Sequence, residues 1–143
     1  MNSTIADAKH VAILGAGPGG LVAARFLLTH GFEPVLFEQS SWLGGQWNQG
    51  APHSGVWPEM FTNTNRVLSR FSDLDWPPGT KMFPRNQEAL AYLERYAEKF
   101  GIRERTRLQH RVNLIEARAT ASGRLPSAHP KAASRQKSIS ASS

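Results

Sequence analysis

A run of glycines between two short apolar segments constrains the fold of this chain more than any other feature. Residues 10–15, HVAILG, are apolar and β-branched and end on a glycine, which is typical of a buried parallel strand. The spacing Gly15-x-Gly17-x-x-Gly20 follows at once, and residues 34–38, PVLFE, form a second apolar run. The sequence therefore predicts a strand, a glycine turn, a helix and a second parallel strand, joined by a right-handed crossover.

The helix of this unit is predicted to begin at Pro18, because proline suits the first helical position, where no N–H group is needed. Its apolar side chains are spaced to pack on a sheet, and they are Leu21, Val22, Ala24, Phe26, Leu27 and Leu28. Gly31 is predicted to end the helix, since glycine is the commonest residue just beyond a helix carboxyl end.

Each glycine of the motif has a separate physical task in a nucleotide-binding turn. Gly15 lets the chain turn sharply off the strand, and Gly17 lacks a Cβ atom, so that a pyrophosphate can approach the backbone. Gly20 lets the helix pack close to the sheet. The amino end of the helix then offers free N–H groups and a positive dipole end to the phosphates.

Glu38 ends the second strand, eighteen residues after Gly20. A carboxylate at this position accepts hydrogen bonds from the hydroxyls of an adenosine ribose and repels a 2′-phosphate. The first nucleotide is therefore expected to be FAD or NAD rather than NADP, and this unit alone does not separate the two. The alternative is that the glycines form only a tight turn and that Glu38 is a solvated strand end.

The rest of the chain is predicted to be an irregular segment, a helix and a third strand. Residues 40–86 are rich in glycine and proline and contain all four tryptophans, which favours a binding segment. Residues 86–100 are predicted to be a helix that Asn86 caps, with an apolar stripe on one face. Residues 107–117 alternate apolar and polar side chains and predict the third strand, with Leu108, His110, Val112 and Leu114 on one face.

The net charge of +6 is confined to the last third of the chain. Residues 101–143 carry nine basic and two acidic residues, whereas residues 1–100 carry eight and nine. We therefore expect a flexible N-terminus over 1–9, one α/β domain over 10–118, and a disordered basic tail over 119–143. A basic tail is weak evidence for binding to RNA or membrane lipid, and no nucleic-acid partner is predicted.

Several classes of site are excluded by residue content. The chain has no cysteine, so disulfides and thiolate metal sites are excluded, and its five histidines show no metal-like spacing. We predict no metal site. The first ten residues lack an apolar core and no run of eighteen apolar residues occurs, so a signal peptide and a membrane span are not expected. The predicted location is cytoplasmic.

Three stretches beyond the glycine motif carry a more specific resemblance. They are FEQSSWLGGQW at 37–47, MFTNTNRVLSRFSDLDWP at 60–77 and FPRNQEALAYLERYAEKFGIRERTRLQHRVNLIEA at 83–117. Together they resemble the N-terminal, FAD-binding section of the flavin-containing monooxygenases and the related Baeyer–Villiger monooxygenases. The fold expected from this resemblance is α/β with a Rossmann-like parallel sheet, here an incomplete FAD-binding domain with a long irregular segment.

The resemblance also implies a reaction. In this family FAD binds at the first glycine motif, NADPH reduces it, and the reduced flavin reacts with O₂ to give a C4a-(hydro)peroxyflavin. That species oxygenates a soft nucleophile, a nitrogen or sulfur, or inserts oxygen beside a ketone. The expected partners are thus a small-molecule substrate and O₂, and the expected class is an oxidoreductase in which the cofactor carries the chemistry.

The resemblance assigns site residues by position. Those implied to bind the cofactor are Gly15, Gly17, Pro18, Gly19, Gly20, Glu38, Gln39, Gly44, Gly45, Trp47 and Asn63. Asn63 is also the implied catalytic residue, with its amide near the reactive edge of the flavin. Alternatives are that Gly44 and Gly45 only shape a turn, that Trp47 is core, and that Asn65 takes the role of Asn63.

The sequence also departs from the family. No second G-x-G-x-x-G motif follows Gly20, so the NADPH site is absent, and the polar tail replaces the expected continuation. A truncated gene model, a splice form or a shifted reading frame would each give such a tail. The alternative function is a truncated, non-catalytic FAD- or NAD-binding module. Three parallel strands leave apolar faces open, so the chain alone is expected to be marginally stable, or to need FAD, self-association or a partner that covers the sheet.

Overall fold

The computed structural model describes residues 9–51, 54–115 and 140–142. Its elements, in chain order, are β1 (His10–Leu14), α1 (Pro18–Thr29), β2 (Glu33–Phe37), η1 (Gly45–Trp47), α2 (Arg66–Ser69), α3 (Asn86–Lys99), η2 (Arg103–Arg105), β3 (Thr106–Arg107), β4 (Arg111–Leu114) and β5 (Ser140–Ser142). The η elements are single turns of 3₁₀ helix.

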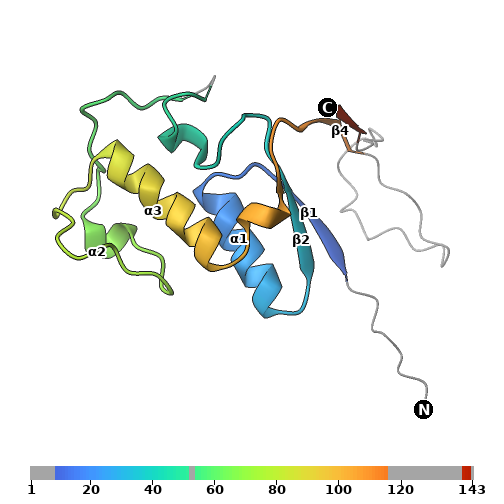
Figure 1. Cartoon of the computed structure of the whole chain (residues 1–143), viewed down its shortest axis with the longest axis horizontal. Coiled ribbons are helices and arrows are strands. Elements are labelled where there is room, and N and C mark those ends of the chain that lie inside the picture. The colour runs from blue at the N-terminus through green and yellow to red at the C-terminus, as the bar shows by residue number, and fades with distance from the viewer. Residues whose placement is uncertain (1–8, 52–53, 116–139, 143) are drawn as a thin grey trace, which may run out of the picture.

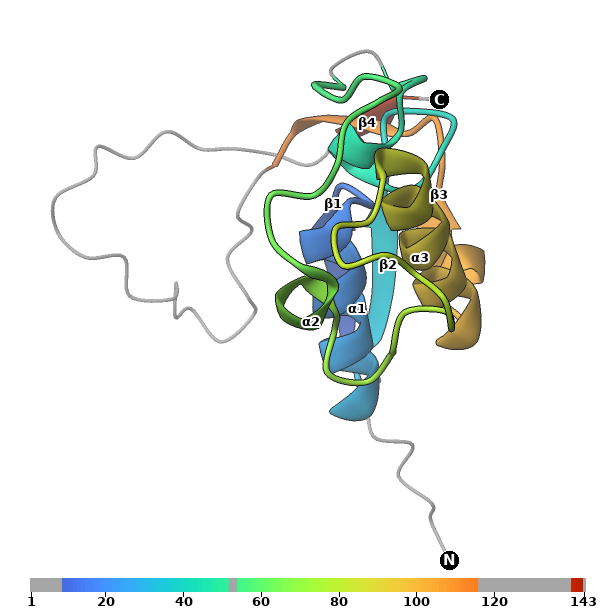
Figure 2. The same cartoon turned by 90° about the vertical axis from the view of Figure 1, so that its left-hand side faces the viewer.

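The predicted strand–helix–strand unit is present, and it forms the centre of a parallel sheet in the order β1-β2-β3. β1 and β2 pair along their whole length, from His10 opposite Glu33 to Leu14 opposite Phe37. β3 pairs with the end of β2, so β1 is an edge strand among the described residues. The helices α1 and α3 lie together on one side of the β1–β2 pair, with α2 farther out (Figures 1 and 2).

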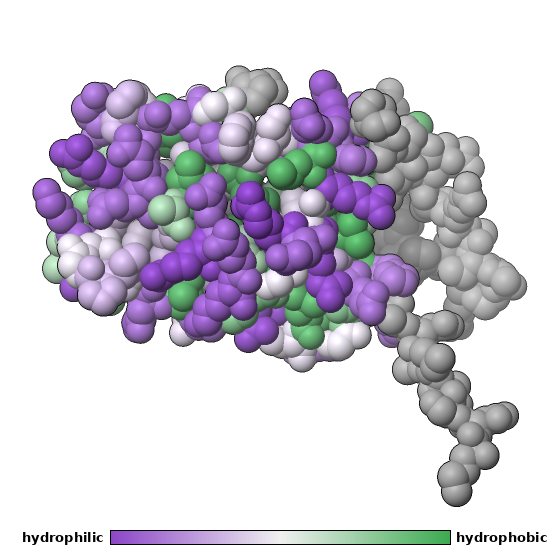
Figure 3. Space-filling model, in the orientation of Figure 1, coloured by the Kyte–Doolittle hydropathy of each residue, from purple (hydrophilic) through white to green (hydrophobic). Residues whose placement is uncertain are grey.

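The core lies where α1 packs on β2 and α3 packs against α1. The fully buried apolar side chains include Leu21 and Ala24 of α1, and Leu36 of β2. The predicted apolar stripe of α3 faces them, and its buried members are Ala89, Tyr92, Leu93, Tyr96 and Ala97. On the face that Figure 3 shows, the surface is mostly polar, and apolar side chains form small scattered groups. Because the stripe is buried on the α1 side, α3 belongs to the same domain as the glycine unit.

Tyr92 attaches the irregular segment to α3. Its hydroxyl accepts a hydrogen bond from the backbone N–H of Phe71 at 2.8 Å and donates one to the carbonyl of Leu74 at 2.6 Å. Trp76 stacks on the same ring, with the ring centroids 4.2 Å apart. Burial raises the pKa of Tyr92 and that of Tyr96, so both side chains stay neutral and act as packed, hydrogen-bonding groups.

A second set of backbone contacts orders the part of this segment before α2. Phe61 forms an isolated antiparallel bridge with Arg85, and the N–H of Thr62 donates to the carbonyl of Pro84 at 2.9 Å. The N–H of Arg66 donates to the carbonyl of Met82 at 2.7 Å. The sequence predicted an irregular binding segment here, and the backbone is held against the amino end of α3.

The predicted third strand over 107–117 is wrong in its length. The structure divides it into β3 and β4, and Gln109 between them has a φ of +58°, in the left-handed region. This conformation turns the chain, so that the N–H groups of Gln109 and His110 donate to the carbonyls of Ser40 and Glu38, both at 2.9 Å. The apolar alternation is real, but a turn interrupts it, and only β3 (Thr106–Arg107) extends the parallel sheet.

Two further expectations differ from the structure or fall outside it. Arg85, not Asn86, precedes the first helical residue of α3, and Glu88 accepts a hydrogen bond from the N–H of Arg85 at 2.8 Å. Asn86 is the first helical residue and is buried. Residues 1–8 and 116–139, which include most of the predicted flexible N-terminus and disordered tail, lie outside the described residues, whereas Ser140–Ser142 form β5 and pair with β4.

Gly20 is the position where a side chain should do most harm. A Cβ atom there would lie 2.1 Å from the carbonyl oxygen of Gly15, a contact that requires α1 to move off the sheet. We predict that Gly20→Ala lowers the free energy of unfolding by about 3 kcal/mol in urea denaturation. Gly19→Ala is the matched control, because its Cβ atom would meet nothing within 4 Å.

Gly19→Ala should leave stability unchanged or raise it by about 0.5 kcal/mol, since alanine favours the helix. Equal losses in the two variants would show that the close approach at Gly20 does not hold α1 on the sheet.

Candidate functional site

The glycine turn connects the carboxyl end of β1 to α1. Gly15 has a φ of +94°, and its N–H donates to the carbonyl of Phe37 at 2.8 Å, so the turn begins in contact with β2. Gly17 precedes Pro18, the first helical residue, and gives α1 no side-chain cap. The first turn of α1 also has no acidic residue. The amino end of α1 therefore keeps N–H groups for an anion to bind.

Glu38 lies beside this turn, as the sequence predicted, and not on the far side of the sheet. The side chain is only 7% exposed. One carboxylate oxygen accepts the N–H of Ala16 at 2.8 Å, and the other accepts the N–H of Ser40 at 2.8 Å. Each oxygen retains a further lone pair that a ligand hydroxyl can use. Glu38 thus links the glycine turn to the end of β2 while still presenting acceptor positions.

The second glycine pair forms a turn that packs on the first. Gly44 and Gly45 have φ values of +100° and +56°, which favour glycine at both positions. The N–H of Gly44 donates to the carbonyl of Ala16 at 3.0 Å, and a Cβ atom on Gly45 would lie 3.0 Å from the Cα of Gly17. The side of Gly17 that lacks a Cβ atom therefore faces Gly45. The two turns are held together by their backbones.

A hollow of about 400 Å³ opens at the carboxyl ends of the strands, where parallel α/β sheets bind their ligands. Its lining residues come from the ends of β1 and β2, from the turn before β4 and from the start of β4. They are Leu14, Gly15, Phe37, Glu38, Gln39, His110, Arg111 and Val112. Of the sequence-predicted site residues, Gly15, Glu38 and Gln39 meet here.

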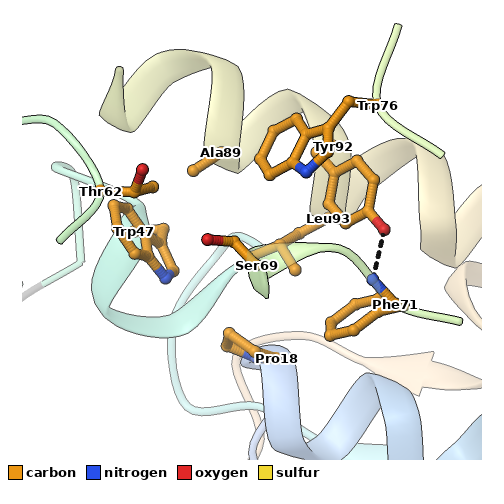
Figure 4. A pocket seen from close by; sticks show the side chains of 9 residues that line it. All are labelled: Pro18, Trp47, Thr62, Ser69, Phe71, Trp76, Ala89, Tyr92 and Leu93. Atoms are coloured by element: carbon orange, nitrogen blue, oxygen red, sulfur yellow. Dashed lines mark hydrogen bonds between the residues drawn. The ribbon is translucent and has the colours of Figure 1, made fainter. Parts of the chain in front are cut away.

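A smaller cavity of about 90 Å³ lies on the α1 and α3 side of the same glycine turn. Figure 4 shows that Pro18 of α1 and Trp47 of η1 both line it, opposite Trp76 and Tyr92. The indole nitrogen of Trp76 is buried without a hydrogen-bond partner within the described part of the chain. Trp47 is half-buried, packs against the core and also lines this cavity.

The structure separates the two asparagines that competed for a cofactor role. Asn65 caps α2, because its side-chain oxygen accepts the N–H groups of Val67 and Leu68 at 3.0 and 3.1 Å. Asn63 is exposed, and its side chain makes no hydrogen bond with the described residues. Thr62, next to it, lines the smaller cavity. Asn65 is thus committed to helix capping, and Asn63 is available to a ligand.

Sequence reasoning missed His110 as a site residue. It placed His110 with Leu108, Val112 and Leu114 on one face of a single long strand, whereas the turn at Gln109 brings it to the hollow beside Glu38. The hydrogen bond from the N–H of His110 to the carbonyl of Glu38 fixes this position at 2.9 Å. The sequence offered one signal for this position, namely that His110 follows closely after a strand of the parallel sheet. The turn itself could not be recognised, because its left-handed residue is a glutamine and not a glycine.

Other classes of site find no support among the described residues. No group of three or more His, Asp or Glu side chains is arranged to hold a metal ion within residues 9–51, 54–115 and 140–142. In the same part of the chain, no helix has both the length and the apolar character needed to cross a bilayer.

Comparison with known proteins gives the family. The model of the flavin-binding monooxygenase-like family matches residues 8–126, most of the chain. The chain belongs to this family. Flavin-containing monooxygenase FMO GS-OX1 of Arabidopsis thaliana is 31% identical over 76% of this chain and 28% of its own length. Flavin-containing monooxygenase 5 of Oryctolagus cuniculus is 36% identical over 66% of this chain and 18% of its own.

Solved structures of related proteins share the fold. S-allyl-L-cysteine S-oxygenase from Allium sativum matches with a TM-score of 0.65 and 32% identity, over 75% of this chain and 30% of that protein. An open structure of cyclohexanone monooxygenase matches with a TM-score of 0.62 and 28% identity, over 73% and 20%. The Rossmann-like α/β fold is thus confirmed. The chain spans less than a third of the length of these relatives.

The two asparagines should respond differently to substitution. Asn65→Ala removes the acceptor for the first N–H groups of α2 and should lower the free energy of unfolding by about 1 kcal/mol. Asn63→Ala, the matched control, removes an exposed side chain without a partner in the described residues and should change stability little. Urea denaturation of both variants followed by tryptophan fluorescence measures the difference. A larger loss for Asn63→Ala would contradict the assignment of Asn65 as the cap.

Proposed function

We propose that this chain is the FAD-binding N-terminal part of a flavin-dependent, NADPH-using monooxygenase. The observation that carries the proposal is the position of Glu38, with its carboxylate held against the glycine turn between a hollow and the uncapped amino end of α1. Membership of the flavin-binding monooxygenase-like family supports FAD over NAD as the first nucleotide.

The described residues fit FAD along the glycine turn. Glu38 would accept hydrogen bonds from the ribose, and the N–H groups of Gly19 and Gly20 at the amino end of α1 would bind the pyrophosphate. The adenine would lie in the hollow next to Gln39. On the other side, Gly44, Gly45 and Trp47 would flank the flavin half. The smaller cavity, which contains Pro18 and Trp47, supports this direction across the turn.

We further propose that the complete enzyme oxygenates soft nucleophiles, nitrogen or sulfur, or ketones. Among the related structures are an S-oxygenase and a cyclohexanone monooxygenase, which support both classes. FAD, when bound, supplies the redox and oxygen-transfer chemistry with O₂. This chain's own part would be to hold the dinucleotide, while the exposed amide of Asn63 would donate or accept hydrogen bonds near the flavin.

The second candidate is a non-catalytic dinucleotide-binding module. It is favoured by the absence of a second G-x-G-x-x-G motif in the 143 residues. A related steroid monooxygenase, by contrast, was solved bound to NADP, the nucleotide that such a second motif would bind. In either function, residues 10–118 would be the FAD-binding domain. A partner or second copy would cover the incomplete sheet, and a cytoplasmic location stays a prediction.

Substitution of Glu38 tests the proposed function. Glu38→Gln removes the charge that strengthens hydrogen bonds from the ribose hydroxyls, so the affinity for FAD should fall roughly tenfold. Glu33→Gln is the matched control, because Glu33 is exposed at the opposite end of β2. Quenching of flavin fluorescence on titration with the full chain measures both affinities, and unfolding curves show whether each variant is folded.

Competition by nucleotides without flavin gives a second measurement on the same residue. ADP-ribose should displace FAD, whereas its 2′-phosphate derivative should compete at least roughly tenfold less well, because Glu38 repels the added phosphate. The difference should shrink in Glu38→Gln. Equal competition in the wild-type chain would show that Glu38 does not face the ribose.

Addition of NADPH under anaerobic conditions tests whether this chain alone can reduce its bound flavin. With FAD bound to the isolated chain, we expect the flavin absorbance to persist, since the chain lacks a second glycine motif for NADPH. Persistence would agree with a module or with an N-terminal part that needs the remaining portion of the enzyme. Rapid bleaching would show that this chain alone contains a functional NADPH site.

A further inference from the structure

The hollow beside Glu38 contains a polar ring that the proposed function does not use. His110 lines the hollow together with Phe37, Gln39 and Arg111. Its backbone is fixed to the carbonyl of Glu38, and its ring centroid lies 6.4 Å from that of Phe37. If the ribose binds at Glu38, the base attached to it is the part of the ligand that reaches His110.

The hydrogen bond made by Nδ1 of His110 determines whether the other ring nitrogen, Nε2, is a donor or an acceptor. Nδ1 lies 2.8 Å from the carbonyl oxygen of Leu108. A carbonyl oxygen only accepts, so Nδ1 carries the hydrogen, and in the neutral imidazole Nε2 is then an acceptor. Within the described residues Nε2 has no hydrogen-bond partner. His110, which lines the hollow, therefore carries an acceptor nitrogen that no described residue uses, on a side chain whose backbone is held in place.

We propose that His110 selects adenine by accepting a hydrogen bond at Nε2 from the 6-amino group of the base. This inference rests on the proposed function, because it places the adenosine half of FAD in the hollow. Adenine carries a donor at position 6, whereas hypoxanthine and guanine carry a carbonyl oxygen there. A carbonyl would set a lone pair against the lone pair of Nε2 and would leave both groups unpaired.

The other polar side chains of the hollow would discriminate differently. The amide of Gln39 offers both a donor and an acceptor and can rotate to suit either base. The guanidinium of Arg111 only donates, so it would favour a 6-carbonyl. Selection for adenine over hypoxanthine that depends on the His110 ring is therefore the signature of His110, and selection in the reverse sense would be that of Arg111.

Binding of ADP and IDP to the full chain tests the inference without any substitution. The two nucleotides share their ribose and diphosphate and differ only in the base. We expect ADP to bind roughly fivefold more tightly than IDP in calorimetric titration, the value of one neutral hydrogen bond. Purine riboside 5′-diphosphate, which has hydrogen at position 6, should fall between them.

Substitution of His110 then assigns the preference to its ring. His110→Phe keeps a planar ring but removes Nε2, so ADP and IDP should bind within about twofold of each other, chiefly through loss of ADP affinity. His30→Phe is the matched control, because His30 also bonds through Nδ1 to a carbonyl, that of Phe26 at 2.8 Å, but is exposed at the carboxyl end of α1. It should keep the wild-type ratio.

The outcomes separate the inference from the proposed function. If FAD and ADP bind but IDP binds as tightly as ADP, the role of His110 is overturned while FAD binding stands. The same holds if His110→Phe retains the preference. If neither FAD nor ADP binds the folded wild-type chain, the proposed function fails, and the inference fails with it.

Discussion

The close contact between α1 and the end of β1 is the constraint on which the other features depend. Gly20 lies against the carbonyl of Gly15 with no room for a Cβ atom, so the first turn of the helix starts directly over the end of the sheet. This position lets the Glu38 carboxylate reach the N–H of Ala16 from the neighbouring strand. It also brings the helix start against the second glycine turn, where Gly45 touches Gly17. One missing methyl group thus sets the arrangement of the whole site.

Much of this architecture could be predicted because it follows from local rules. The strand–turn–helix–strand order follows from two apolar runs and three spaced glycines, and the structure confirms it. Helix α3 could be predicted from its apolar stripe, which is buried as expected. In each case the residues that determine the element are close together in sequence, so no knowledge of distant contacts is needed.

The features that could not be predicted depend on contacts between distant segments. The apolar alternation after Arg107 is compatible with one long strand, and only the hydrogen bonds of Gln109 and His110 to the 38–40 segment make a turn the better solution. Likewise, the sequence suggested that Gly17 admits a phosphate, whereas its open side meets Gly45 from a turn almost thirty residues later. The position of His110 in the hollow depends on the same turn at Gln109.

The backbone around Asn63 has a consequence for any ligand that meets its side chain. On one side the N–H of Thr62 bonds to Pro84, on the other the N–H of Arg66 bonds to Met82, and the Asn65 side chain closes the following helical turn. Ordering a free loop around a ligand would cost conformational entropy for every residue that becomes fixed. Here the backbone is already ordered when the domain folds. A molecule that contacts Asn63 would therefore need to fix little more than the side-chain amide of this residue.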